Sequence, residues 1–290
     1  MTRTLTMTEP VFEKPLPAPS KVRPATFFVV TYLLSWLIWI PLVLSRFAVV
    51  PFSVAGDTGV LISFAGVLMP SISALVLTAF REGLPGIRRL LEPIKQWKVG
   101  WVWWGAAGLV QPVLLLLTAL AYKAFGFQPT ITSEPVTSII SLVINIIFLL
   151  LATTGEEIGW RGLALPALQQ RMSALKASII LGLSSVIWHV PYWLLQSSFT
   201  QYGVGYLLLN FVFGLPLTFY ITWFYNHGRF SLLLPIVFHF TFNIVNVALL
   251  PVTSSIGAFA ILIALEWMMA ILLLRHLEPK VQPVGNLKSV

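Results

Sequence analysis

The sequence contains no cysteine among its 290 residues, and only 10% of those residues are charged. The missing thiols exclude a disulfide framework, a thiolate metal site and a cysteine nucleophile. A soluble domain carries about 25% charged residues, whereas 57% of this chain is hydrophobic and its mean hydropathy is +0.87. The polar surface is too small to cover a soluble globule, so the composition excludes an ordinary cytosolic domain.

The charges that are present have an excess of +8, from 18 Lys and Arg against 10 Asp and Glu. In a soluble protein such an excess would suggest nucleic acid. Here the cations gather between long apolar stretches, which indicates a lipid bilayer as the partner. We therefore expect no nucleic-acid partner.

Eight apolar stretches approach or exceed the length of about 20 residues that a helix needs to cross a bilayer. They begin near Ala25, Val60, Gly100, Val136, Leu175, Gly203, Ser231 and Ile256, and end near Val50, Phe80, Phe125, Leu168, Leu195, Tyr225, Leu250 and Leu274. The predicted fold class is all-α, a polytopic membrane protein of about eight transmembrane helices. Residues 1–24 are predicted to form a disordered cytoplasmic tail, residues 25–275 the transmembrane domain and residues 276–290 a cytoplasmic C-terminal tail.

Positive charge predicts the orientation of these spans, because cytoplasmic loops of membrane proteins carry an excess of Lys and Arg. With both termini on the inside, sixteen of the 18 cationic residues fall on the cytoplasmic side, and only Arg46 and Lys123 fall outside. The sequence therefore predicts a multi-pass protein of the cell (plasma) membrane with both termini cytoplasmic.

A few polar side chains lie inside the apolar stretches, where an ionisable group costs about 2.5–3.5 kcal/mol and indicates function. They are Glu156, Glu157 and Arg161 in the fourth stretch, His189 in the fifth, His239 and Asn243 in the seventh, and Glu266 in the eighth. Glu266 stands alone in its span, so we expect it to make a structural hydrogen bond.

The fourth stretch, residues 136–168, is too long for one straight crossing, since about 33 residues span roughly 50 Å. Gly155, Gly159, Gly162 and Pro166 offer places where this stretch could bend or break.

Within this stretch, Glu157 and Arg161 are four residues apart and can pair on one helix face. Glu156 then points about 100° away from that pair, without a partner in its own helix.

Glu156, His189 and His239 lie at similar depths, roughly 15–22 Å from the nearest cytoplasmic cation if their helices are straight. This coincidence predicts a shared site. One carboxylate and two imidazoles can activate a water molecule, either directly or through a metal. The alternative is that these side chains only hold helices together, as isolated intramembrane polar residues often do.

The order of these motifs resembles a known family. Glu156-Glu157-x-x-x-Arg161, a His189 in the next span and His239-x-x-x-Asn243 in a later one are similar to the CPBP group, which includes CAAX prenyl endopeptidases, bacteriocin-processing enzymes and abortive-infection proteins. The likeness covers about residues 135–250. One departure is Ser185, which stands where the family commonly has Phe four residues before the second-motif His.

The resemblance implies a role for each motif residue. Glu156 would be the general base and His189 would hold and polarise the attacking water. His239 and Asn243 would stabilise the oxyanion or complete the polar site, while Glu157 and Arg161 would support the site or hold substrate. Glu156, His189 and His239 could instead form a two-His-one-carboxylate zinc site, and the resemblance leaves open whether such a divalent metal is bound.

The leading hypothesis is an intramembrane endopeptidase that cleaves membrane-associated proteins or peptides, with CAAX-like sequences among the candidates. A second hypothesis is a non-catalytic membrane scaffold or bacteriocin self-immunity protein. The third is a proton-coupled transporter, because intramembrane Glu and His also form proton relays. Transporters often carry inverted repeats, and the sequence shows none.

Overall fold

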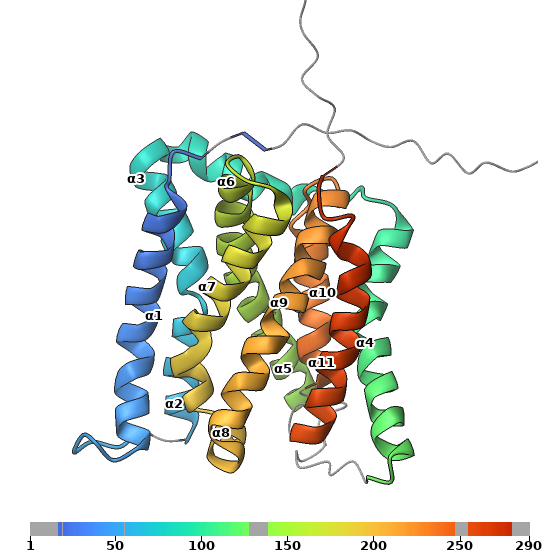
Figure 1. The fold of residues 1–290 in the computed structure, drawn as a ribbon. Helices are drawn as coiled ribbons and strands as arrows, with labels where there is room; N and C mark the ends of the chain where they lie inside the picture. The colour runs from blue at the N-terminus through green and yellow to red at the C-terminus, as the bar shows by residue number, and fades with distance from the viewer. Residues whose placement is uncertain (1–16, 19, 55, 128–138, 247–254, 280–290) are drawn as a thin grey trace, which may run out of the picture.

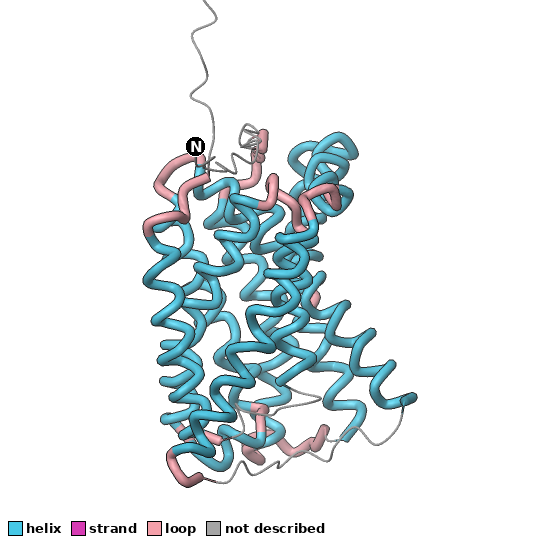
Figure 2. Tube along the Cα trace, turned by 90° about the vertical axis from the view of Figure 1, so that its right-hand side faces the viewer, coloured by secondary structure: helices cyan, strands magenta, loops and turns pink. Residues whose placement is uncertain are grey.

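The computed structural model describes residues 17–18, 20–54, 56–127, 139–246 and 255–279, and these ranges contain helices but no strand (Figure 1). The perpendicular view shows the same helices running side by side (Figure 2). The prediction of an all-α fold is confirmed. The helices are α1 (Pro24–Arg46), α2 (Gly56–Val67), α3 (Met69–Leu91), η1 (Glu92–Lys95), α4 (Trp101–Ala124), α5 (Ile139–Glu157), the π-helix η2 (Ile158–Ala164), α6 (Leu165–Gln169), α7 (Ala174–Leu194), α8 (Ser197–Tyr202), α9 (Val204–His227), α10 (Leu233–Ile244) and α11 (Ile256–Leu274).

Six spans among the described residues are long and apolar enough to cross a membrane. A seventh appears if the bent pair Thr58–Val67 and Met69–Lys95, which turns by 43°, counts as one crossing. The remaining predicted stretch contains α10, a shorter apolar helix of 12 residues. Residues 136–138 and 247–250 of the predicted stretches lie outside the described residues. Each predicted stretch thus contains a helix, which confirms a polytopic fold of about eight.

The helices place large apolar side chains on the outside of the bundle as well as inside it. Phe80 is 85% exposed, Leu272 71% and Leu37 70%. A helix satisfies its own backbone hydrogen bonds, so such faces are stable in contact with lipid tails. The outer surface therefore fits the hydrocarbon of a bilayer.

Three tryptophans form the centre of the core beside the polar motifs. Trp39 on α1, Trp160 on η2 and Trp188 on α7 are each fully buried. The ring centroids of Trp39 and Trp188 are 4.9 Å apart, and those of Trp160 and Trp188 are 5.5 Å apart. These contacts join three helices that are distant in sequence.

The long fourth stretch is not broken at its glycines. It runs as one helical rod from α5 through η2 to α6, and the π-helix widens it locally. The glycines instead allow the bend between α2 and α3 to pack closely against α5 and η2. A Cβ added to Gly155 would lie 2.6 Å from Leu68 Cδ2, and one added to Gly159 would lie 2.5 Å from the carbonyl oxygen of Pro70.

The described parts of both predicted tails contact the bundle. Ser20 Oγ and the Lys21 amide donate hydrogen bonds to Glu82 Oε1 at 2.7 and 3.0 Å. At the other end, Glu278 Oε1 accepts from the backbone N–H of Ala174 at 2.8 Å. Residues 1–16, 19 and 280–290 of the predicted tails lie outside the described residues.

Sidedness can be tested directly because the native chain has no cysteine. In Figure 1 the described N-terminal segment and α6 lie at one end of the bundle, and α8 lies at the other. We expect a membrane-impermeant maleimide to label Thr200→Cys from outside intact cells, and to label Lys95→Cys only after permeabilisation. Labelling of Lys95→Cys in intact cells would contradict the predicted orientation.

Candidate active site

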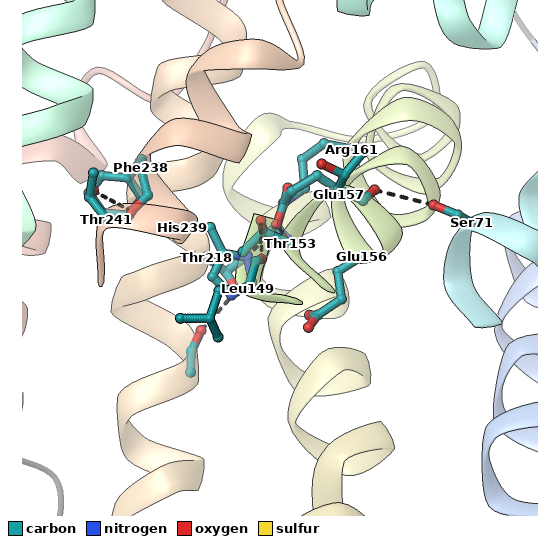
Figure 3. Close-up of polar contacts among 12 residues, drawn as sticks. Ser71, Leu149, Thr153, Glu156, Glu157, Arg161, Thr218, Phe238, His239 and Thr241 are labelled. Carbon is teal, nitrogen blue, oxygen red and sulfur yellow. Dashed lines mark hydrogen bonds and ion pairs between the residues drawn. The ribbon is translucent and has the colours of Figure 1, made fainter. Parts of the chain in front are cut away.

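Glu157 is the centre of a buried ionic cluster. Its side chain is 0% exposed, and Oε1 lies 3.0 Å from Arg161 Nη1 and 2.9 Å from His239 Nδ1 (Figure 3). The i,i+4 pairing with Arg161 predicted from the sequence is confirmed. The hydrogen bond to His239 was not predicted, because 82 residues separate the two and no local pattern connects them.

Glu156 turns away from this cluster, as Figure 3 shows. Its side chain is 8% exposed, and Oε2 lies 3.9 Å from His189 Nε2 on α7. That distance is too long for a direct hydrogen bond. A gap of this size lets one water molecule contact both atoms.

The ring of His189 is held in a defined orientation. Its Nδ1 lies 2.8 Å from the carbonyl oxygen of Ser185, one turn earlier on α7. A carbonyl only accepts, so Nδ1 carries the proton, and in the neutral ring Nε2 keeps a lone pair that faces Glu156. The ring also stacks on Trp193, with centroids 5.3 Å apart and planes 9° apart.

The departure at Ser185 from the family pattern leaves this hydrogen bond intact. The atom that His189 contacts is the backbone oxygen, which every residue type provides. The side chain at position 185 is therefore not needed to set the tautomer of His189.

His239 and Asn243 lie one turn apart on α10 and share a helix face. Because the Glu157 carboxylate accepts from Nδ1 of His239, that nitrogen carries a proton and Nε2 is turned elsewhere. Asn243 is half-buried. Thr241 Oγ1 lies 2.9 Å from the carbonyl oxygen of Phe238 on its own helix and 3.2 Å from that of Ala107 on α4, so α10 and α4 are in contact here.

The predicted shared site thus takes the form of two neighbouring acid–imidazole pairs. Glu156 faces His189, and Glu157 binds His239. Consecutive residues on one helix point about 100° apart, so the two adjacent glutamates reach two different helices.

The zinc site considered for Glu156, His189 and His239 is not formed as a set of three ligands in this geometry. His239 donates Nδ1–H to Glu157, which leaves only its Nε2 as a further donor or ligand atom. Within the described ranges, no group of three His, Asp or Glu side chains is placed to hold a metal ion.

Glu266 does not belong to this site. It is 0% exposed on α11, which packs against α4 and α9. The Tyr220 hydroxyl donates to the backbone carbonyl of Glu266 at 3.0 Å. The side chains of Gln111 on α4 and Tyr220 on α9 also interact with the Glu266 carboxyl group, and the structural hydrogen bond expected of Glu266 stays a prediction.

Comparison with known proteins covers most of the chain. Residues 136–245 match the family model for type II CAAX prenyl endopeptidase, Rce1-like. The curated CAAX prenyl protease 2 of Methanococcus maripaludis is 30% identical over 246 residues, which is 81% of this chain and 88% of that relative. The matched range of the family model contains both acid–imidazole pairs.

The buried cluster predicts a specific loss of stability. Glu157→Gln removes the charge that balances Arg161, and losing one partner of a buried ion pair costs about 3–5 kcal/mol. We expect a clearly lower Tm in detergent. Glu92→Gln is the matched control, because its ion pair with Lys95 at 3.6 Å is 69% and 77% exposed and such pairs contribute about 0–1 kcal/mol. Equal Tm values for the two variants would contradict this interpretation.

Proposed function

This chain belongs to the Rce1-like family of type II CAAX prenyl endopeptidases, and we propose that it hydrolyses peptide bonds with a water molecule activated by Glu156 and His189. Family membership makes the chain an intramembrane endopeptidase. The single observation that supports the mechanism is the buried 3.9 Å gap between Glu156 Oε2 and His189 Nε2.

In the proposed first step, the water donates one hydrogen to Glu156 and the other to His189 Nε2, which leaves an oxygen lone pair for attack. The new C–O bond forms as Glu156 takes the first proton. Glu156 then returns this proton to the amide nitrogen as the C–N bond breaks. Low exposure keeps bulk water away from the carboxylate, which suits a general base.

In the same proposal, His239 and Asn243 stabilise the negative charge on the substrate oxygen. His239 donates through Nε2–H when its ring is protonated, while Nδ1–H stays bound to Glu157. The Glu157 carboxylate balances the positive ring, as the acid of a catalytic triad does. Arg161 holds Glu157 in place. Oxyanion donors of this kind are worth about 10²–10³-fold in kcat.

We propose a membrane-anchored protein or peptide as the substrate. The name of the archaeal relative refers to prenylated CAAX sequences, in which a lipid is attached near the C-terminus. The first turns of α5, the helix that carries Glu156, are strongly exposed: Ile139 is 82% and Ile140 72% exposed. An apolar surface on the helix that leads to the site is suited to a lipid-bearing substrate. We place the enzyme in the cell membrane with both termini cytoplasmic.

The proposed catalytic role of Glu156 can be distinguished from a contribution to stability. Glu156→Gln keeps the shape and removes the base, so we expect kcat to fall about 10²–10⁴-fold with KM and Tm nearly unchanged. Cleavage of a farnesylated peptide that ends in a Cys-aliphatic-aliphatic-X sequence gives the measurement. The matched control is Glu266→Gln, a buried glutamate outside the site, which should retain kcat.

Near wild-type turnover by Glu156→Gln, together with a folded but inactive Glu157→Gln, would assign the base to the other glutamate. If Glu156→Gln, Glu157→Gln, His189→Ala and His239→Ala all kept the cellular phenotype of the wild-type protein, a scaffold function would replace the enzymatic one.

Metal removal provides a further test. Because the water is proposed to contact Glu156 and His189 directly, exhaustive dialysis against a chelator should leave kcat unchanged. Loss of activity that returns on addition of zinc would overturn the direct mechanism.

A further inference from the structure

Helix α1 donates two side-chain hydrogen bonds to the backbone of α7. The Tyr32 hydroxyl donates to the carbonyl of Ser184, and Trp36 Nε1 donates to the carbonyl of Trp188 at 3.1 Å. Donors and acceptors are each four residues apart, so the two bonds lie one turn apart along both helices. They fix α7 against sliding and against rotation relative to α1.

A third contact joins the same two helices to α2. Trp188 Nε1 donates to Ser35 Oγ at 2.7 Å, and Ser35 Oγ donates to the carbonyl of Gly66 at 2.9 Å. Ser35 is 0% exposed. In an apolar interior each of these bonds is expensive to leave unmade, so the three-helix junction has one preferred arrangement.

The segment of α7 that receives these bonds is locally weakened. Pro191 lies inside the helix and has no N–H, so the carbonyl of Ile187 loses its partner in the helical ladder. His189 lies between these two positions. One donated bond ends just before this proline-weakened turn, at Ser184, and the other ends within it, at Trp188, so both help to hold the turn in place.

The other wall of the site is positioned from the same junction. Ser71 on α3 donates to the carbonyl of Thr154, two residues before Glu156, at 3.3 Å. The bend between α2 and α3 also packs against Gly155. Since Ser35 binds α2 and Trp36 binds α7, α1 is the element that relates the Glu156 helix to the His189 helix.

The distance between Glu156 and His189 depends on this placement. The ring of His189 is fixed to its own helix by Ser185 and Trp193, so Nε2 moves only as α7 moves. A gap of 3.9 Å admits one bridging water, and a displacement of about 1 Å in such a geometry can cost about 10²-fold in rate.

We propose that Tyr32, Ser35 and Trp36 are positioning residues that set α7 so that His189 Nε2 stands opposite Glu156. They contact neither substrate nor water and act through His189. This inference rests on the proposed function, because it assigns the purpose of the junction to the Glu156–His189 water site.

The test removes the two donors and keeps an aromatic ring at each position. Tyr32→Phe/Trp36→Phe should lower kcat about 10–100-fold on the farnesylated peptide, with KM within about twofold of wild type, since the geometry of the water site rather than substrate binding is altered. Trp36→Phe alone should give a smaller loss of kcat in the same direction, and serves if the double variant does not fold.

Trp267→Phe is the matched control. Trp267 Nε1 donates to the carbonyl of Val212 at 3.0 Å, so this substitution also removes one interhelical indole-to-backbone bond. The bond that it removes joins α11 to α9 and does not involve α7. We expect its kcat to match wild type even if its Tm falls as far as that of Trp36→Phe.

A double variant that contains His189→Ala separates the positioning of His189 from a general loosening of helix packing. In His189→Ala, the Trp36→Phe change should have no further effect on kcat, because the ring that it positions is gone. A full additional loss in that background, or a Trp36→Phe effect confined to Tm, would overturn the inference. If Glu156→Gln keeps its activity, the proposed function itself fails; if Glu156→Gln is inactive and the α1 variants retain kcat, only the positioning role fails.

Discussion

Glu157 is completely enclosed by protein, so the charge of its carboxylate must be balanced by side chains rather than by water. Arg161 supplies that balance from the same rod, and His239 supplies a second hydrogen bond from α10. These two bonds bring α10 against the end of α5. The bond to His239 also determines which nitrogen of its ring points toward Glu157. The neighbouring Glu156 is then directed to α7 by the geometry of the helix alone.

The parts of this arrangement that could be predicted from the sequence are those that depend on the spacing of residues within one segment. Apolar stretches gave the helices, and the spacing of Glu157 and Arg161 gave their ion pair. The bond between Glu157 and His239 depends on how α5 and α10 meet, and nothing within either segment encodes that meeting. Resemblance to a family placed both residues in one site, but as a support and an oxyanion donor rather than as partners.

The glycines of the fourth stretch show how a local rule can point to the wrong cause. Gly155 and Gly159 permit bending, yet the rod continues through Gly155 as an α-helix and through Gly159 as a π-helix. Their lack of a side chain is used instead for the close approach of Leu68 and Pro70. Likewise, α1 carries no family motif, and the role of its donors Tyr32 and Trp36 depends on the position of α7 beside it. Interhelical contacts between side chains and backbone leave no periodic trace in sequence.

The adjacency of the two glutamates has a consequence for how the chain is made. Arg161 follows Glu157 by four residues, so this pair can neutralise itself as soon as one helix has formed at the translocon. Glu156 finds His189 only after a further helix, α7, has been synthesised. Until then its carboxyl group must enter the membrane protonated or wait at the interface, since an isolated buried charge is too costly. The glutamate that we propose as the general base is thus the last of the three to be accommodated during biogenesis.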